Sequence, residues 1–253
     1  MSDQQEPRAP IRPRKKGSDR RRKYRRARKN FFVAFLIDLV VVLGAALVLS
    51  LLIKTFLIRS FFIPSGSMLE TLQIDDRIIV NQLTPALYPI ERGDVVVFKD
   101  PGGWLGPNIE EPTDPVVVAV DWFLSAFGIT APDSKQHLVK RVIGTAGDKV
   151  VCCDEQGQIT VNGVPITEPY IAPGQTPSSV EFDVTVPANS LWVLGDNRGN
   201  SEDSRFHADL PSKGFVSNDW VVGRAFIISW PVSNWKWLDN YPDVYKDVPN
   251  PSN

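Results

Sequence analysis

Two serines separated by a single glycine stand in an apolar part of the chain. Pro64 and Gly66 flank Ser65, and Ser67 follows Gly66, so the segment is predicted to turn tightly and to present two hydroxyls. A serine hydroxyl is a weak nucleophile until a neighbouring general base activates it. The segment is therefore a candidate nucleophile loop, although these residues by themselves are equally typical of a plain turn.

The identity of the base decides which serine chemistry is open to the chain. Neither of its two histidines, His137 and His207, is preceded by a G-x-S-x-G motif, so a Ser-His-Asp triad has little support. A lysine is the alternative base. The Ser-x-x-Lys match from Ser233 to Lys236 lies in a Trp-rich segment without the partner motifs of penicillin-binding enzymes, and we interpret it as coincidence.

The only two cysteines, Cys152 and Cys153, are adjacent. Their spacing leaves two possibilities open, a strained vicinal disulfide or two thiols. Two cysteines without a histidine cluster do not supply a zinc site, and we expect no metal and no other cofactor.

Three further motifs follow the serine segment Phe61 to Leu72 along the chain. They are R-G-D-V-V-V-F from Arg92, K-R-V-I-G from Lys140 with a Gly-Asp pair at 147–148, and G-D-N-R-G-N-S-E-D-S-R from Gly195. In this order, behind an N-terminal apolar segment, they resemble the motifs of type I signal peptidases (leader peptidases), in particular bacterial ones of Gram-positive or actinobacterial kind. The resemblance covers about residues 31 to 230.

The resemblance implies a serine endopeptidase that removes signal peptides from exported preproteins after small residues, at Ala-x-Ala-like sites. It implies that Ser67 is the nucleophile and Lys140 the general base. The Ser65 hydroxyl and the Ser67 backbone N–H would form the oxyanion hole, and Ser201 would form a hydrogen bond with the Lys140 amine. Two ion pairs would hold the loops of the site: Asp203 with Arg205, and Asp196 with Arg141.

A lysine base needs an unusual environment, because only its neutral form accepts a proton. A free lysine titrates near pH 10.4, so roughly one in a thousand is neutral at pH 7.5, a penalty of about 4 kcal/mol. Burial among apolar side chains lowers the pKa. Val139, Val142 and Phe98 are candidates for that role.

The resemblance also implies shallow apolar pockets for the first and third residues before the scissile bond. Their expected lining is Phe61, Ile63, Pro64, Leu72 and Val139. Two residues depart from the family pattern: Glu70 stands where many members have Pro, and Leu138 where some have Tyr. Neither carries the chemistry, so we interpret both as subgroup differences.

The N-terminal part of the chain divides sharply by charge. Residues 1–30 carry thirteen Lys/Arg against three Asp/Glu, and we expect them to form a disordered tail. The apolar run 31–53 is long enough, at about 34 Å as a helix, to span a bilayer as an uncleaved anchor. The basic flank places the tail in the cytoplasm and the remainder outside the plasma membrane, in single-pass topology.

Beyond the anchor, short Val/Ile-rich runs separated by turn signals predict a mainly β fold. We expect an antiparallel β-sheet catalytic domain of the signal peptidase and LexA-like type at residues 56–245. Within it, residues 100–137 are expected to form a loop with an apolar insert, which would pack as a lid or rest on the membrane. Residues 150–187 are expected to form a small β excursion, and 246–253 a C-terminal tail.

Two other readings of the sequence remain. A LexA-like self-cleaving regulator would need a DNA-binding domain, which the basic tail and apolar span do not supply, so we expect no nucleic acid partner. A membrane-tethered β-domain that binds a partner without cleaving it would not need Ser67 or Lys140, and both are present. The expected partners are signal peptides, the lipid bilayer and, by proximity, the secretion translocon.

Overall fold

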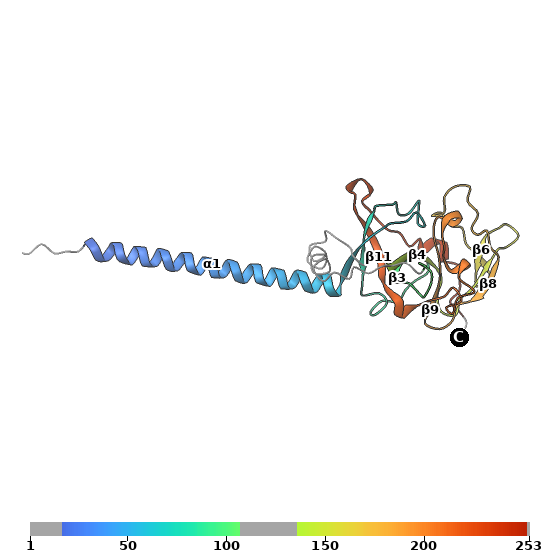
Figure 1. The fold of residues 1–253 in the computed structure, drawn as a ribbon, viewed down its shortest axis with the longest axis horizontal. Helices are drawn as coiled ribbons and strands as arrows, with labels where there is room; N and C mark the ends of the chain where they lie inside the picture. Colours follow the sequence, from blue (N-terminus) through green and yellow to red (C-terminus); the bar gives the residue numbers. More distant parts are fainter. Residues whose placement is uncertain (1–16, 107–135, 252–253) are drawn as a thin grey trace, which may run out of the picture. The chain divides into compact units, whose positions relative to one another are not determined.

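A long helix forms the N-terminal part of the described chain. The computed structural model describes residues 17–106 and 136–251. Helix α1 is Gly17–Phe56 (Figure 1), and its segment Val33–Ile53 is long and apolar enough to cross a membrane. The predicted disorder of the tail is wrong from residue 17 onward, because Arg, Lys and Ala propagate a helix readily once it is nucleated. Residues 1–16 lie outside the described part.

The chain divides into two compact units, Met1–Ser50 and Leu51–Asn253, and the second contains all the described strands. Its main sheet has the strand order β1-β2-β11-β3-β4-β9-β10, with β12 paired to β11, and the described pairings are antiparallel. The mainly β prediction is therefore confirmed. The strands are β1 (Ile58–Phe62), β2 (Arg77–Asn81), β3 (Val95–Lys99), β4 (His137–Gly144), β9 (Ser190–Leu194), β10 (Val216–Ser217), β11 (Val221–Trp230) and β12 (Lys236–Trp237).

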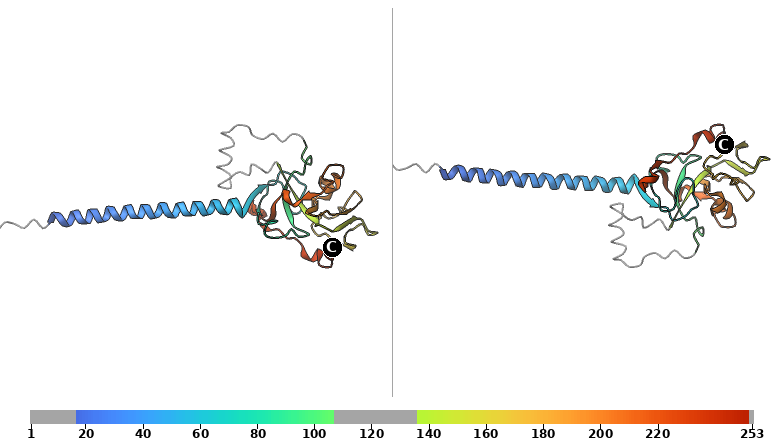
Figure 2. Two further views of the ribbon diagram at one scale, coloured as in Figure 1. Left: turned by 90° about the horizontal axis from the view of Figure 1, so that it is seen from below. Right: turned by 90° about the horizontal axis from the view of Figure 1, so that it is seen from above.

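A smaller antiparallel sheet corresponds to the predicted β excursion. Its order is β7-β6-β5-β8, built from β5 (Lys149–Cys152), β6 (Ile159–Val161), β7 (Val164–Pro165) and β8 (Phe182–Thr185). Asn162 and Gly163 join β6 to β7 with positive φ angles of 50° and 81°, which Asn and Gly tolerate best. Figure 2 shows the small sheet at one edge of the second unit. Cys152, at the end of β5, forms a disulfide with Cys153.

Apolar clusters on both faces of the main sheet hold these parts together. On β3, Val95 and Val97 join one cluster while Val96 and Phe98 join another, as expected for a strand buried on both faces. A third cluster packs strands β5 and β6 of the small sheet against Ile143, Trp192 and Leu194 of β4 and β9. The small sheet is therefore docked on β4, which carries the Lys140 motif, and on β9, which leads directly into the motif that begins at Gly195.

The C-terminal segment is not a separate tail as far as residue 251. Val248 is buried, and the Pro249 carbonyl accepts hydrogen bonds from the side chains of Arg92 and Asn162. Residues 107–135, which include most of the predicted apolar insert, lie outside the described residues. The remaining short elements are η2 (Arg198–Asn200), η3 (Ser204–Phe206), η4 (Asn218–Trp220), η5 (Val232–Asn234) and α3 (Pro242–Tyr245).

Candidate active site

The predicted nucleophile loop follows β1 directly. Backbone hydrogen bonds between Ile63 and the Asp75–Asp76 turn close its base, at 2.9 Å each. Met68 is 1% exposed and lies in the apolar cluster of β1, β2, β3 and β11. The side chain of Met68 therefore anchors the turn, while the preceding serines lie nearer the surface.

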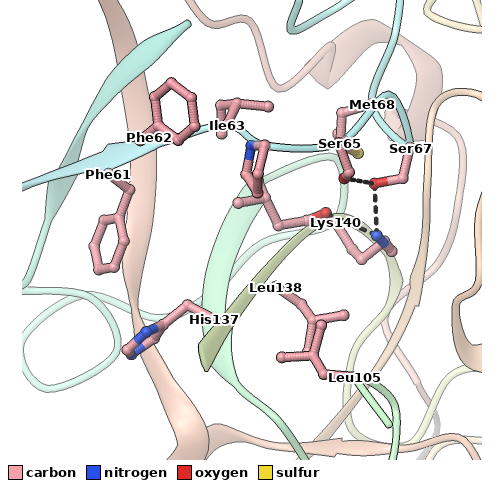
Figure 3. A pocket seen from close by; sticks show the side chains of 12 residues that line it. Phe61, Phe62, Ile63, Ser65, Ser67, Met68, Leu105, His137, Leu138 and Lys140 are labelled. Atoms are coloured by element: carbon pink, nitrogen blue, oxygen red, sulfur yellow. Dashed lines mark hydrogen bonds between the residues drawn. The ribbon is translucent and has the colours of Figure 1, made fainter. Parts of the chain in front are cut away.

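Ser67 and Lys140, separated by 73 positions in the sequence, meet at this loop. Lys140 Nζ donates a hydrogen bond of 2.8 Å to Ser67 Oγ and one of 3.2 Å to the Val139 carbonyl oxygen (Figure 3). Strand β4 supplies the lysine, and the loop after β1 supplies the serine. The candidate nucleophile and the candidate base are thus within the distance that proton transfer requires.

Lys140 is buried in an apolar environment, with 3% of its surface exposed. Its cross-strand partner is Val96, and Leu138 and Val142 share its face of β4. Burial lowers the pKa of Lys140 to about 8, against smaller opposing effects of the charges of Asp203 and Asp196. Among the described residues, Lys140 forms no ion pair that would fix its charge.

The other serines occupy distinct positions. Ser65 is exposed, and its Oγ lies 3.4 Å from Ser67 Oγ, on the open side of the dyad. The predicted hydrogen bond from Ser201 to Lys140 is wrong: Ser201 Oγ is buried and makes no hydrogen bond among the described residues. Ser201 lies instead against Gly195, where an added Cβ would collide with the Ser201 side chain and with the Ser67 carbonyl oxygen.

Both predicted ion pairs are formed in the structure and are fully buried. Arg141 binds Asp196 through two nitrogens, at 2.8 and 2.9 Å, and Arg205 Nε lies 2.8 Å from Asp203. The Asp203 carboxylate also accepts the Gly195 N–H. Three of the four residues, Asp196, Asp203 and Arg205, belong to the segment that follows β9, and the pairs neutralise buried charges without engaging the Lys140 amine.

A pocket opens beside the dyad between the β1 end and β4 (Figure 3). Four of the five predicted lining residues, Phe61, Ile63, Pro64 and Val139, do line it. Leu72 does not: it is fully buried in the apolar cluster beneath the loop, where its N–H bonds the Met68 carbonyl in a helical turn. The sequence reasoning missed Phe62, Met68, Leu105, His137 and Leu138 as lining residues.

His137 lies in the pocket away from Ser67 (Figure 3) and contacts the Phe61 ring, with 5.1 Å between ring centroids. Burial and the positive charges of Arg59 and Lys99 lower the pKa of His137 to about 4, so it is neutral at pH 7. His137 therefore adds no charge to the end of the pocket that lies away from the dyad. In the chain described here, no three His, Cys, Asp or Glu residues gather as metal ligands.

Comparison with known proteins gives a consistent result. A family model for signal peptidases of peptidase family S26 matches residues 36–230. Signal peptidase I of Mycobacterium tuberculosis (strain ATCC 25618 / H37Rv) is 40% identical over 210 residues, covering 75% of this chain and 71% of that protein. A probable signal peptidase I of Mycobacterium leprae (strain TN) is 36% identical over 208 residues, covering 72% and 71%. Signal peptidase I of Leptolyngbya laminosa is 35% identical over 192 residues, covering 76% and 78%.

Proposed function

The chain belongs to the S26 family of signal peptidases, serine endopeptidases that act on the signal peptides of preproteins, and we propose that Ser67 is its nucleophile and Lys140 its general base. The observation that carries this assignment is the 2.8 Å contact between Lys140 Nζ and Ser67 Oγ, made by a lysine that burial biases towards its neutral form. A solvated lysine would be neutral in fewer than about one molecule in a thousand at pH 7, whereas a pKa of about 8 leaves about a tenth of Lys140 neutral and able to accept the proton.

In the first half of the reaction, neutral Lys140 accepts the Ser67 proton as Oγ bonds to the scissile carbonyl carbon. The carbonyl oxygen becomes an oxyanion, for which the Ser65 hydroxyl and the Ser67 N–H are the proposed donors. When the tetrahedral intermediate collapses, the carbon–nitrogen bond breaks. The leaving amine takes the proton from the Lys140 ammonium, and the signal peptide remains esterified to Ser67.

In the second half, water replaces the departed amine. Lys140 accepts a proton from the water as its oxygen bonds to the ester carbonyl carbon, and the oxyanion forms again in the same place. Collapse breaks the bond to Ser67 Oγ, which regains the proton from Lys140. The signal peptide leaves as a free carboxylic acid, and both members of the dyad return to their starting protonation states.

The pocket supports the proposed preference for small residues before the cleavage site. Ile63, Pro64 and Val139 offer apolar surface next to Ser67, and the buried Met68 also lines the pocket. A shallow apolar pocket favours small side chains such as alanine and excludes larger ones by overlap. We propose that this surface receives the first and third residues before the scissile bond.

We also propose a single-pass topology with the basic residues 1–30 in the cytoplasm and the catalytic unit outside. The apolar segment Val33–Ile53 and the excess of Lys/Arg before it support this orientation. The bilayer and, by proximity, the translocon are then its neighbours. Protease added to intact spheroplasts should leave the tail uncleaved. Digestion of the tail under these conditions would mean that the chain has the opposite orientation in the membrane.

Two serine variants test the chemical assignment. Ser67→Ala should abolish cleavage of a membrane-bound preprotein and labelling by a serine-directed acylating inhibitor. Ser65→Ala should still be labelled, but with kcat lowered about a hundred to a thousandfold by the loss of one oxyanion donor, and with KM little changed. Labelling of Ser67→Ala but not of Ser65→Ala would mean that the nucleophile is Ser65.

A further inference from the structure

Asn197 donates hydrogen bonds to two consecutive carbonyl groups of the nucleophile loop. Its side-chain Nδ2 donates a hydrogen bond of 2.8 Å to the Gly66 carbonyl oxygen, and its backbone N–H donates one of 3.1 Å to the Ser67 carbonyl oxygen. Asn197 is 8% exposed and belongs to the loop between β9 and η2. The polypeptide on both sides of the Ser67 nitrogen is therefore held from one side.

The orientation of the Gly66 carbonyl determines where the Ser67 N–H points. The C=O of Gly66 and the N–H of Ser67 belong to one planar peptide group, and in a trans peptide they point in opposite directions. Asn197 Nδ2 and, at 3.2 Å, the Leu69 N–H both donate to this carbonyl oxygen, and Asn197 thereby helps to direct the Ser67 N–H away from itself. A hydrogen bond accepted by the carbonyl further polarises the N–H of the same peptide and strengthens it as a donor.

Asn197 can serve this role only if its side-chain Nδ2, and not its Oδ1, faces the Gly66 carbonyl. A hydrogen bond from Gln175 fixes this orientation. Gln175 Nε2 donates to Asn197 Oδ1 at 3.0 Å, which leaves Asn197 Nδ2 directed at Gly66. The orientation of Gln175 is set in turn, since its Oε1 accepts the Gly199 N–H at 3.2 Å. We call the series of hydrogen bonds from Gly199 through the side chains of Gln175 and Asn197 to Gly66 the relay. Each of its two side-chain amides donates at one end and accepts at the other.

Gln175 comes from the segment between β7 and β8 of the small sheet, which is itself held in place. The Gln175 N–H closes a turn onto the Ala172 carbonyl at 3.1 Å, with Gly174 at φ +83°, a conformation that favours glycine. The same segment binds Arg198, whose guanidinium pairs with buried Glu168 and donates to the Pro177 carbonyl. The small sheet thus presents Gln175 on a fixed support.

We infer that Gln175 and Asn197 are positioning residues for catalysis, which act through the Gly66–Ser67 peptide to aim the Ser67 N–H at the oxyanion. This inference rests on the proposed role of that N–H in the oxyanion hole. It assigns the small sheet a part in the reaction, because a side chain that the sheet presents completes the relay to the nucleophile loop. The relay touches neither Ser67 Oγ nor Lys140 Nζ, so it acts on the transition state and not on the base.

The test uses the full chain in detergent micelles with a signal-peptide substrate. Asn197→Leu should lower kcat about a hundredfold, and Gln175→Leu about tenfold, with KM within about twofold of wild type. Gln175→Glu separates positioning from packing, because it keeps the shape of the side chain but replaces the donor Nε2 by an oxygen that repels Asn197 Oδ1. It should lower kcat at least as much as Gln175→Leu, whereas a packing role would make it the milder change.

A second readout follows the oxyanion itself. A peptide aldehyde, which adds to Ser67 and places its oxygen in the oxyanion hole, should lose affinity in parallel with kcat. The corresponding peptide alcohol, which forms no adduct, should bind all variants alike. The pH midpoint of kcat/KM should stay at the wild-type value, because the surroundings of Lys140 are unchanged. Gln156→Leu, at an exposed glutamine in the turn between β5 and β6, is the matched control and should behave as wild type.

The inference is overturned if Asn197→Leu and both Gln175 variants keep wild-type kcat, or if aldehyde and alcohol lose affinity equally. If Asn197→Leu does not fold, as judged by its thermal transition, the half-buried Gln175 carries the test alone. Ser67→Ala distinguishes failure of the proposed function from failure of the positioning role of Gln175 and Asn197. An active Ser67→Ala enzyme refutes the proposed function, whereas an inactive one beside fully active relay variants refutes only the relay.

Discussion

Lys140 and Arg141 are consecutive residues of β4, both with 3% or less of their surface exposed, and the fold handles their charges in opposite ways. Arg141 binds Asp196, donates to the Gly93 and Asp239 carbonyls, and lies 4.1 Å from the centre of the Tyr170 ring. Lys140 has a serine hydroxyl, one carbonyl and apolar side chains around it. The pKa of Arg141 is raised, mainly by Asp196 against the effect of burial, and that of Lys140 is lowered.

The difference shows how a strand separates structural from chemical charge within one peptide unit. Successive side chains of β4 point to opposite faces of the sheet, so one face can be paired and the other left unpaired. The paired face fixes a permanent cation that organises the loop after β9. The unpaired face keeps an amine that loses its proton near neutral pH. Four sets of substitutions test this difference between Lys140 and Arg141, and the variants with the strongest predicted effect come first.

The largest effect is expected when Lys140, the proposed base, is replaced by a permanent cation. In Lys140→Arg the guanidinium stays protonated at any working pH and cannot accept the Ser67 proton. We expect kcat to fall by at least about ten-thousandfold. Cleavage of a preprotein, with folding monitored by the thermal transition, measures this, and substantial turnover by a folded Arg variant would exclude Lys140 as the base.

The second effect concerns the paired face. Arg141→Leu leaves the Asp196 carboxylate buried with Thr71 as a remaining donor, and we expect a loss of about 3 to 5 kcal/mol in the free energy of unfolding. Arg141→Leu combined with Asp196→Leu should recover a large part of that loss, because no unpaired charge remains. Denaturation of wild type, Arg141→Leu and the double variant in detergent gives the comparison. A single variant as stable as wild type would mean that the pair holds nothing together.

Much of this site could be predicted from the sequence, because four motifs in fixed order identified Ser67, Lys140 and both ion pairs. Contacts between distant segments were not accessible in the same way. Leu105 and His137 reach the pocket from elements outside the serine motif, and Gln175 reaches the loop after β9 from the small sheet. No periodicity or spacing encodes such contacts, because they depend on how the sheets dock.

The errors have local physical causes. Leu72 was assigned to the pocket by the family resemblance, but a turn of backbone hydrogen bonds directs it into the core. The tail was judged disordered from its charge, although Arg and Lys are good helix formers next to an apolar helix. The hydroxyl of Ser201 is near Gly195 and not on Lys140, which shows that membership of a motif does not fix a hydrogen bond.

The third prediction is that the burial of Lys140 makes the free energy of unfolding depend on pH. Its pKa is about 8 in the folded protein and near 10.5 in the unfolded chain, so the unfolded chain binds more protons between these values. The free energy of unfolding should therefore rise with pH across this window, and below pH 8 the charge costs about 3 kcal/mol. Lys140→Met should remove that cost at pH 7 and the pH dependence with it. Lys149→Met, at an exposed lysine, should change neither.

The smallest effect makes Lys140 more like its neighbour. In the wild type, kcat/KM should rise about tenfold per pH unit up to a midpoint near 8, because the fraction of neutral Lys140 limits the rate. Leu138 shares the face of β4 with Lys140, two residues away, and Leu138→Glu would add a carboxylate there. An opposite charge favours the protonated amine, so the midpoint should rise by about one unit or more.

Leu138→Gln is the matched control for this last change, since it alters the shape and polarity of the pocket by the same amount without adding charge. Both variants are expected to change KM, because Leu138 lines the pocket, so the readout is the pH midpoint and not the rate. The Gln variant should keep a midpoint near 8, while the Glu variant should approach the behaviour of a paired cation. Equal midpoints in the two variants would mean that a nearby carboxylate does not control the base, and that the missing counter-ion is not what separates Lys140 from Arg141.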